Sequence, residues 1–488
     1  FKIPFPIHTS EVMLFLTVNS LKEGRESLYN PSIDGIELRL DRFETIDFTA
    51  ISALLLDSPL PFLFTLRKAT EGGKFFGSEE ERFVLIEQLM QLTPSFFDLE
   101  YDIPAFFLKK MRKKHPSVKL ILSYHNFENT VDIEKQLAKM SSPHAFGYKI
   151  ACHVNSSLDA LRICTSIQDK NVALLGMGRL GEITRILSPV TGNLFNYASR
   201  AEDSSPAGQL PVSFLDQVYH YRILTKNTAC YALIGDPVEM SPSHITHNRV
   251  FERLGIDAVY VKIPIKREEL SAFFSFMNKV PIRGVSITMP HKECSLPLLD
   301  QIDQEACTIG AVNTVQLKKG KLCGTNTDGS GALDALETKI SVRGKRIVIL
   351  GAGGTAKAIA FHAKQRGAEV IILNRTALKA ESLARELQCI GGGLEKIAHL
   401  SYDILINATS VGMSGVAECP IDPKTLLPKT VVLDAVMRET LLLQEAAKRE
   451  CTCLNGKELF LHQAVRQFMF WFPGIDTERV KTIMKEEL

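Results

Sequence analysis

The sequence predicts an α/β chain in two halves, and this prediction depends on three observations. Apolar runs of strand length alternate with helical stretches throughout residues 1–223. Residues 346–376 have the pattern of a strand, a glycine turn, a helix and a second strand. Polar residues repeatedly stand at the point where an apolar strand ends. Alternating strands and helices favour parallel sheets, whose ligands bind at the carboxyl ends of the strands.

The first half contains eight apolar runs, which fall at 12–18, 35–40, 62–66, 96–99, 118–123, 145–151, 172–176 and 194–197. Helical stretches such as 79–91 and 157–167 separate them. Eight β/α repeats in a segment of this length are typical of a (β/α)8 barrel, whose chemistry lies at the C-terminal strand ends. We therefore expect residues 1–223 to form such a barrel and the polar stretch 224–229 to be a linker.

Charged and polar side chains interrupt these strands near their ends. Glu37, Arg39 and Asp41 have a spacing of two, which predicts that all three lie on one face of a strand. His125 ends the fifth run, and Lys149 lies inside the sixth. Burial of a lysine lowers its pKa and makes the neutral amine available, as Schiff-base chemistry with a ketone requires.

Each of these residues also has a structural interpretation. A strand histidine can be a hydrogen-bonded core residue, a strand lysine can extend to water, and Arg39 with Glu37 can be an ion pair. Their shared position at the same end of successive strands favours a site, because packing alone does not explain such a set.

The second half contains a glycine turn between a strand at 347–350 and a helix at 355–366. Small residues there allow backbone N–H groups and the helix N-terminus to approach a pyrophosphate. A tight turn can need glycine for steric reasons alone, but the flanking strands favour a Rossmann-type dinucleotide site. The residues of this turn are Gly351, Ala352, Gly353, Gly354, Thr355 and Ala356.

The residues after the second strand of this unit indicate which dinucleotide binds. An NAD site usually has an acidic residue there, whereas this chain has Asn374, Arg375 and Thr376. A guanidinium offers a planar set of donors that suits a 2′-phosphate, so the sequence predicts NADP. The alternative is that Arg375 is a solvated loop cation.

Between the linker and the glycine turn, three motifs place polar residues directly after strands, at 284–292, 310–314 and 324–329. Ser241 and Ser243 precede a helix, where they could be N-cap residues or a hydroxyl pair that binds a carboxylate. Lys292 and Asp328 could form an acid/base pair if the fold brings them together. We expect a substrate lobe at 230–333, completed by a C-terminal helix at 457–488, and a nucleotide lobe at 334–456.

Composition limits the remaining possibilities. A net charge of +2 without a basic tract argues against a nucleic-acid partner, and ten scattered cysteines are consistent with a reducing cytoplasm. We expect no membrane span, no targeting segment and no metal site, although the chain begins with Phe and a missing leader stays open. His244, His247 and His291 lack a carboxylate at a familiar ligand spacing. Oligomeric state stays open.

The first half resembles the type I 3-dehydroquinate dehydratases. The matching motifs are Glu-Leu-Arg-Leu-Asp at 37–41, Phe-Thr-Leu-Arg at 64–67, Glu-Gly-Gly at 71–73, Ser-Tyr-His at 123–125, Lys149, 177–185 and Ser-Pro-Ala-Gly-Gln at 205–209. This resemblance implies that Lys149 forms the imine, that His125 transfers the proton and that Glu71 orients His125. Arg185 would hold the carboxylate, and the residues for the ring hydroxyls would be Glu37, Arg39, Arg67, Ser205 and Gln209.

The second half resembles the shikimate dehydrogenases. The resemblance implies a catalytic pair, Lys292 and Asp328, and substrate contacts from Ser241, Ser243, Thr288, Asn313 and Gln463. The implied NADP contacts are the glycine turn, Asn374, Arg375, Thr376 and Lys379, and a second loop of Asn407, Ala408, Thr409 and Ser410. The chain departs from the family pattern at Met437, where a Tyr is usual, and in a shorter loop that ends at Thr440.

Together the halves resemble the fused shikimate-pathway enzyme, and we expect two steps: dehydration of 3-dehydroquinate, then NADPH-dependent reduction to shikimate. Three alternatives stay open. The barrel could be a structural partner of a single-activity shikimate/quinate dehydrogenase, the second half could prefer quinate or NAD, or it could only sense a nucleotide.

Overall fold

A computed structural model describes residues 12–166, 171–200, 208–414 and 416–488. The chain forms two compact units. One comprises residues 1–230, 254–265 and 272–281, and the other comprises 231–253, 266–271 and 282–488. Three sheets organise the chain: one of eight strands and two of six strands.

The eight-stranded sheet is the predicted barrel. Its strands are β1 (Met13–Val18), β2 (Gly35–Arg39), β3 (Phe62–Thr65), β4 (Phe96–Glu100), β5 (Lys119–Asn126), β6 (Gly147–His153), β7 (Val172–Met177) and β8 (Phe195–Ala198). All their pairings are parallel, in the order β7-β6-β5-β4-β3-β2-β1-β8. Near β8, the Leu194 amide donates to Val172 O at 2.9 Å, so the two end strands of the sheet approach each other and the barrel is nearly closed.

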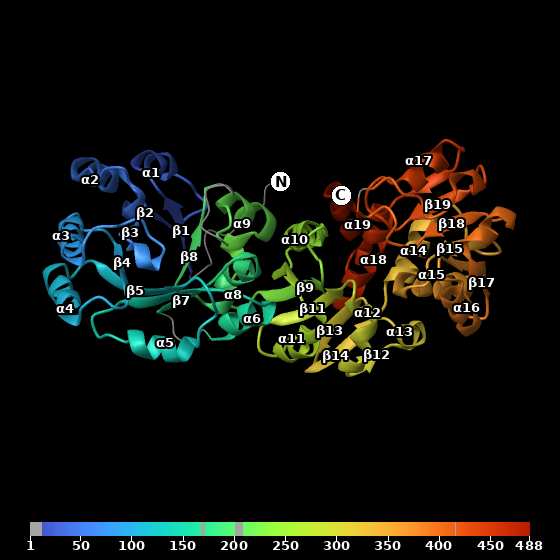
Figure 1. Ribbon diagram of the computed structural model, residues 1–488, viewed down its shortest axis with the longest axis horizontal. Coiled ribbons are helices and arrows are strands. Elements are labelled where there is room, and N and C mark those ends of the chain that lie inside the picture. The colour runs from blue at the N-terminus through green and yellow to red at the C-terminus, as the bar shows by residue number, and fades with distance from the viewer. Residues whose placement is uncertain (1–11, 167–170, 201–207, 415) are drawn as a thin grey trace. The chain divides into compact units, whose positions relative to one another are not determined.

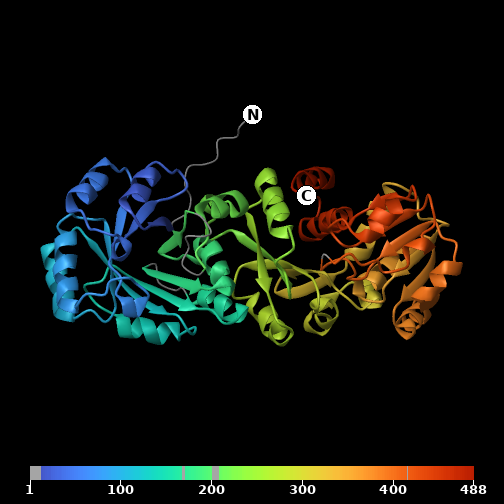
Figure 2. The same ribbon diagram turned by 45° about the horizontal axis from the view of Figure 1, so that its top comes forward.

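Helices follow the barrel strands and cover their outer side, as the blue to green part of Figures 1 and 2 shows. They are α1 (Leu21–Ser27), α2 (Phe48–Asp57), α3 (Glu79–Met90), α4 (Ala105–Lys114), α5 (Ile133–Met140), α6 (Ser157–Thr165), α7 (Glu182–Ile186), α8 (Ser188–Thr191) and α9 (Val212–Tyr219). Ser78 starts α3 with a capping box, in which its hydroxyl accepts from the Glu81 amide at 3.2 Å. The predicted fold class is confirmed for this half.

Large apolar side chains fill the inside of the barrel. Phe15, Phe96 and Phe195 pack edge to face, with Phe15 and Phe195 ring centroids 5.2 Å apart. Tyr197 belongs to the same cluster and is fully buried. The barrel interior is therefore a packed core rather than a channel, and its chemistry must lie where polar side chains end this packing.

The second sheet is mixed and has the order β10-β9-β11-β13-β14-β12. Its strands are β9 (Ala229–Gly235), β10 (Ala258–Pro264), β11 (Ile282–Ile287), β12 (Gln301–Ile302), β13 (Thr314–Lys318) and β14 (Lys321–Thr325). Its helices are α10 (Ser243–Leu254), α11 (Leu270–Phe276), α12 (His291–Cys294), α13 (Gln304–Ile309) and α14 (Asp328–Glu337). Strand β13 runs antiparallel to both β11 and β14.

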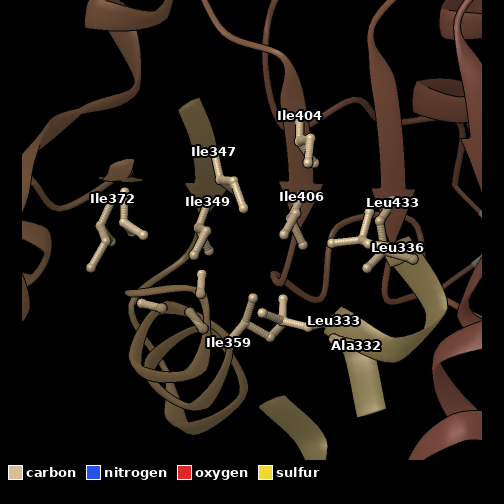
Figure 3. Close-up of a cluster of buried hydrophobic side chains, with 14 of the residues drawn as sticks. Ala332, Leu333, Leu336, Ile347, Ile349, Ile359, Ile372, Ile404, Ile406 and Leu433 are labelled. Atoms are coloured by element: carbon tan, nitrogen blue, oxygen red, sulfur yellow. The ribbon is translucent and has the colours of Figure 1, made fainter. Parts of the chain in front are cut away.

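The third sheet is fully parallel and has the order β17-β16-β15-β18-β19-β20. Its strands are β15 (Arg346–Leu350), β16 (Glu369–Asn374), β17 (Ile390–Gly393), β18 (Ile404–Asn407), β19 (Val431–Asp434) and β20 (Thr452–Leu454). Helices α15 (Gly354–Gln365), α16 (Ala377–Glu386) and α17 (Leu441–Ala447) connect them. Figure 3 shows apolar side chains of the sheet, such as Ile349 and Ile406, facing Ile359 of α15 and Leu333 of α14.

The C-terminal segment 457–488 is two helices rather than the one expected from the sequence. α18 (Gly456–Trp471) ends before Pro473 and Gly474, and α19 (Thr477–Glu486) begins after them. Proline disfavours the helical conformation of the residue before it, and Gly474 has a φ of 88°, outside the helical region.

Small residues allow α14 to pack closely against two other helices. A Cβ on Gly329 would lie 2.1 Å from Ala358 O of α15, and a Cβ on Gly331 would lie 2.5 Å from the Gln463 amide nitrogen of α18. These close contacts hold α14, which begins at Asp328, against the helix of the glycine turn and against the helix that carries Gln463.

Candidate functional site

The first candidate site is a cavity at the C-terminal ends of the barrel strands. Its lining comes from six of the eight strands, β2, β3 and β5 to β8, or from the loops that follow them. The lining residues are Glu37, Arg39, Arg42, Arg67, Glu71, Gly72, His125, Phe127, Lys149, Ala151, Leu175, Met177, Arg185, Tyr197 and Gln209. Five of these side chains are cations, so the cavity favours an anionic small molecule.

Lys149 lies within β6, and its side chain is 7% exposed. Its Nζ lies 3.1 Å from Asp98 Oδ2 and 4.1 Å from the centroid of the Tyr197 ring. Burial lowers the pKa of Lys149, while the carboxylates of Asp98 and Glu37 oppose this. The amine is therefore held in a fixed position with a larger neutral fraction than an exposed lysine has.

His125 lies beside Glu71 at the cavity. Its Nδ1 is 3.0 Å from Glu71 Oε2, and the same oxygen accepts from the His125 backbone amide at 2.9 Å. Burial, together with Arg67 and Lys149, lowers the pKa of His125 well below its ordinary value. Burial raises the pKa of Glu71 to about 7. A neutral histidine that donates from Nδ1 to Glu71 presents Nε2 as a base.

Asp98 is the member of this cluster that sequence reasoning missed. Its carboxylate binds Lys149 and Arg67 and accepts from Ser123 Oγ at 2.6 Å, and the Asp98 Oδ1 to Arg67 Nη2 distance is 2.9 Å. Burial would raise its pKa, but Arg67 and Lys149 hold the pKa of Asp98 well below its ordinary value. The available signal was an acid inside the apolar run 96–99, at the level of the strand ends.

Glu37 is fixed by two threonine hydroxyls. Thr17 Oγ1 donates to its Oε2 at 2.7 Å, and Thr65 Oγ1 donates to its Oε1 at 2.8 Å. The amide of Gln209 donates to Thr17 Oγ1 at 3.3 Å, which places Gln209 beside this group. Ser205, the other predicted contact from the same loop, lies outside the described residues.

The expectation that Asp41 shares a strand face with Glu37 and Arg39 is wrong. Strand β2 ends at Arg39, and Asp41 lies in the 3-10 turn Leu40–Arg42 that follows. Arg39 Nε and Nη2 bind the two carboxylate oxygens of Asp41 at 3.0 and 2.9 Å. Arg39 therefore pairs with Asp41, and the ion pair with Glu37 that the sequence left open is not made.

Arg185 is buried on α7, and its Nη1 lies 3.5 Å from Tyr197 O. Burial lowers the pKa of Arg185 to about 10. Among the described residues no carboxylate lies within ion-pair distance of this guanidinium, which suits it to bind an anion.

The second candidate site contains Lys292 and Asp328, which the fold brings into direct contact. Lys292 Nζ donates to Asp328 Oδ2, and Asn313 Nδ2 donates to Asp328 Oδ1 at 2.7 Å. Asn313 Nδ2 also lies 2.9 Å from Thr327 Oγ1 and 3.4 Å from Gln463 Oε1. The three predicted motifs and α18 thus supply one polar cluster. The expectation that the 310–314 motif directly follows a strand is wrong, because this motif follows α13 and precedes β13.

Ser241, Ser243 and Thr288 follow the neighbouring strands β9 and β11. Ser241 Oγ donates to Ser243 Oγ at 3.0 Å, and the Thr288 amide donates to Ile234 O of β9 at 2.9 Å. Within the described ranges, no hydrogen bond joins these three side chains to the Lys292 cluster.

The glycine turn lies at the C-terminal end of β15, between the ends of β16 and β18. Gly351 has a φ of 116°, and a Cβ there would lie 3.0 Å from Ala408 O. Gly353 precedes α15 and has open space where a side chain would be. The turn therefore leaves the helix N-terminus accessible to a phosphate group.

Two further loops flank the turn, as the parallel register requires. Arg375, Thr376 and Lys379 are exposed after β16. Asn407 at the end of β18 accepts from Thr409 Oγ1 at 2.7 Å and donates to Asp434 Oδ1 at 2.9 Å. Burial raises the pKa of Asp434, which also accepts from Thr440 Oγ1 at 2.7 Å. Asp434 thereby fixes both Asn407 and the shortened loop after Met437.

Three family models match the chain in succession. The model described as type I 3-dehydroquinase matches residues 12–226. The shikimate dehydrogenase substrate binding domain matches residues 233–315, and shikimate / quinate 5-dehydrogenase matches residues 334–417.

Relatives combine these parts in one chain. The chloroplastic bifunctional 3-dehydroquinate dehydratase/shikimate dehydrogenase of Arabidopsis thaliana is 34% identical over 468 residues, which cover 89% of this chain and 77% of that protein. The shikimate biosynthesis protein AroDE of Chlamydia trachomatis serovar D is 34% identical over 401 residues, covering 81% and 82%. Shikimate 5-dehydrogenase from Thermus thermophilus, solved with NADP(H) and shikimate, has a TM-score of 0.50 and 32% identity, and covers 53% of this chain and 100% of that one.

The fold and the two sites define a two-enzyme chain, in which a barrel with a buried lysine precedes a two-lobed dinucleotide-binding reductase. The chain belongs to the family of bifunctional 3-dehydroquinate dehydratases/shikimate dehydrogenases. Across the described residues, no helix has the length and apolarity needed to span a membrane.

Proposed function

We propose that this chain dehydrates 3-dehydroquinate to 3-dehydroshikimate in the barrel and then reduces that ketone to shikimate with NADPH in the second unit. The observation that carries the proposal is the complementary chemistry of the two sites. One holds a buried amine beside a histidine base, and the other holds a Lys292–Asp328 pair near a dinucleotide turn.

In the first reaction, the neutral amine of Lys149 attacks the C3 ketone to give a carbinolamine. Uptake of one proton from solvent and loss of water then give a protonated imine, and the later hydrolysis returns that proton. His125 Nε2 removes a proton from C2, and the electron pair moves into the iminium group. The same imidazole then returns its proton to the leaving C1 hydroxyl, which departs as water. Hydrolysis of the imine releases 3-dehydroshikimate and restores Lys149.

The other cavity residues bind and orient. Glu71 holds the Nδ1 proton of His125, so that Nε2 is directed as the base. Asp98 is the counter-ion of both the Lys149 amine and the iminium that replaces it. Arg185 binds the substrate carboxylate, because a guanidinium can make two parallel hydrogen bonds to it. The hydroxyl contacts are Glu37, Arg39, Arg67, Ser205 and Gln209.

In the second reaction, the substrate carboxylate is bound by the hydroxyls of Ser241 and Ser243, and the ring hydroxyls by Thr288, Asn313 and Gln463. Lys292 holds a proton at the ketone oxygen, and Asp328 accepts a hydrogen bond from Lys292 and fixes its position. Asn313 in turn orients Asp328.

The nucleotide site fits NADP. Open space in front of Gly353 and the accessible start of α15 suit a pyrophosphate. The exposed cations Arg375 and Lys379 suit a 2′-phosphate, with Asn374 and Thr376 beside them. The loop of Asn407, Ala408, Thr409 and Ser410 forms the other side of the site. When bound, NADPH supplies the hydride.

A coupled assay with two variants tests the proposal. The unmodified chain should consume NADPH when given dehydroquinate. Lys149→Met should abolish this but retain NADPH consumption from dehydroshikimate, whereas Lys292→Met should accumulate the dehydroshikimate enone without consuming NADPH. Borohydride with dehydroquinate should add the substrate mass to Lys149. Unchanged NADPH consumption from dehydroquinate in Lys149→Met would contradict the dehydratase assignment.

Substrate and nucleotide preference need a separate measurement. Steady-state rates with shikimate and quinate, each with NADP and NAD, should favour shikimate and NADP. Arg375→Ala should raise the KM for NADP and leave the KM for NAD nearly unchanged, because only NADP has the 2′-phosphate. An unchanged ratio of the two KM values would refute the role of Arg375.

The proposed location is the cytoplasm, supported by the ten cysteines, all of which are free thiols. A tagged full-length protein should fractionate with cytoplasmic markers. Recovery in an organelle, where the plant relative is named as residing, would contradict this.

A further inference from the structure

Arg42 is a cation of the barrel cavity to which the proposed dehydratase reaction assigns no role. It ends the 3-10 turn Leu40–Arg42 that follows β2, and its side chain lines the cavity together with Lys149 and His125. Its Nε is buried, and among the described residues this nitrogen has no hydrogen-bond partner. A buried donor without an acceptor is costly, so an oxygen acceptor at this nitrogen would be favourable.

Two other cations of the cavity, Arg39 and Arg67, have acidic partners inside the protein. Arg39 is bound by both oxygens of Asp41, and Arg67 is bound by Asp98. Across the described ranges, no carboxylate lies within ion-pair distance of Arg42. Burial and the charge of Arg39 lower the pKa of Arg42, against smaller opposing effects from Asp41 and Glu37. An oxygen acceptor that entered the cavity would relieve both the missing hydrogen bond and the uncompensated charge.

We propose that Arg42 is a further substrate-binding residue of the dehydratase site, which donates from Nε to an oxygen of the bound cyclic polyhydroxy acid. The inference rests on the proposed dehydratase function. Glu37 and Arg39 lie on the strand that leads into Arg42, so the contact belongs to the side of the substrate that these residues bind. Lysine cannot replace arginine here, because its ammonium has no donor at the Nε position.

The experiment compares Arg42→Ala, Arg42→Lys and a control, Arg112→Ala, whose exposed guanidinium on α4 binds Pro116 O. The inhibition constant of quinate is measured against dehydroquinate in the dehydratase assay. Quinate has the carboxylate and hydroxyls of the substrate but no ketone, so it reports binding without imine formation. The dehydratase assay confines the measurement to the barrel even though the second unit can also bind such acids.

For Arg42→Ala we expect the quinate inhibition constant and the KM for dehydroquinate to rise about tenfold or more, as loss of one charge-assisted hydrogen bond requires. Arg42→Lys should resemble Arg42→Ala, added ethylguanidinium should restore part of the affinity of Arg42→Ala, and Arg112→Ala should match the unmodified chain. Values within twofold of the unmodified chain for Arg42→Ala, or full affinity in Arg42→Lys, would overturn the proposal.

Folding of the variants is checked at saturating dehydroquinate. Borohydride should still trap the Lys149 adduct in Arg42→Ala, because the imine-forming group is intact. If the unmodified chain itself formed neither the adduct nor the enone, the proposed dehydratase function would fail. If the unmodified chain formed both the adduct and the enone, but the Arg42 variants bound quinate as tightly as the unmodified chain, the inference on Arg42 would fail and the dehydratase function would stand.

Discussion

Asp98→Asn tests whether one buried carboxylate organises the barrel site. The substitution keeps the size of the side chain and removes its charge. It leaves Lys149 and Arg67 in the cavity with no counter-ion at 3.1 and 2.9 Å, respectively. Because imine formation in the proposed reaction converts the amine into a cationic iminium, Asp98 should stabilise charge during the reaction as well as before it.

The size of the effect follows from these contacts. Two unit charges 3.1 Å apart attract by about 5 kcal/mol at an effective dielectric constant of about 20. This value is an upper limit for the interaction energy that Asp98→Asn removes from the Lys149–Asp98 pair. Removal of one partner from a buried ion pair costs about 3–5 kcal/mol of folding free energy. For activity, loss of one charge-assisted hydrogen bond in the transition state costs about 1.5–3 kcal/mol, so kcat/KM should fall about 10- to 150-fold.

The pH profile distinguishes this role from simple destabilisation. In the proposed mechanism, dehydratase kcat/KM should rise with pH as Lys149 loses its proton, and Asp98 favours the protonated form. Its removal lowers the pKa of Lys149, so the acidic limb of the profile should move to lower pH even though the maximum falls. The matched control is Asp102→Asn, which removes the partner of Lys68 from a pair whose aspartate is 48% exposed. If Asp98→Asn had the same kcat/KM as Asp102→Asn, and its acidic limb lay at the same pH, the reasoning would be refuted.

Three further variants test other parts of the chain. Because the folded chain raises the pKa of Glu71 from 4.5 to about 7, proton binding stabilises the folded state, and stability is lost as pH rises through this interval. Glu71→Gln should remove this dependence, measured as the difference in Tm between about pH 5 and about pH 8. Asp334 of α14 binds Arg366 at 2.8 Å and Arg466 at 3.0 Å, so Asp334→Asn should destabilise the second unit by about 1–2 kcal/mol in denaturant unfolding, and an unchanged midpoint would contradict this. Gly351→Ala should raise the KM for NADPH at least about tenfold, because a Cβ would approach Ala408 O to 3.0 Å at a φ of 116°, and an unchanged KM would argue against the turn as the nucleotide site.

The fold was largely predictable because short segments of the sequence carry the signals for each strand and helix. Every barrel strand is an apolar run bounded by turn or helix signals, and all eight predicted runs coincide with β1–β8 to within a few residues. The dinucleotide unit follows the same logic, since its glycine pattern lies between two β-branched strands. The C-terminal segment was predicted less well, because the helix propensity around it masked the break at Pro473 and Gly474.

The site was less predictable because hydrogen bonds and ion pairs form between side chains that are close in space but far apart in the sequence. Residues on separate strands, such as Asp98 and Lys149, meet only through the register of the barrel, and sequence spacing gives no direct sign of it. Asp41 shows the opposite error: its spacing predicted a strand face, but β2 ends earlier and the chain turns. The Lys292 cluster combines motifs beside three different strands. The sequence suggested that these motifs could meet, but it could not predict which side chains hydrogen-bond to one another.

In the proposed function the two units use a lysine–aspartate pair for different purposes, and the exposed fractions of the two pairs differ. In the barrel, the Lys149 and Asp98 side chains are 7% and 0% exposed, so desolvation favours the neutral amine that must attack a ketone. In the second unit, the Lys292 and Asp328 side chains are 17% and 6% exposed. In the proposed reduction Lys292 holds a proton at the ketone oxygen, and its side chain has more contact with water than that of Lys149. Under the proposed function, the same pair of residue types thus serves nucleophilic attack in one fold and proton delivery in the other.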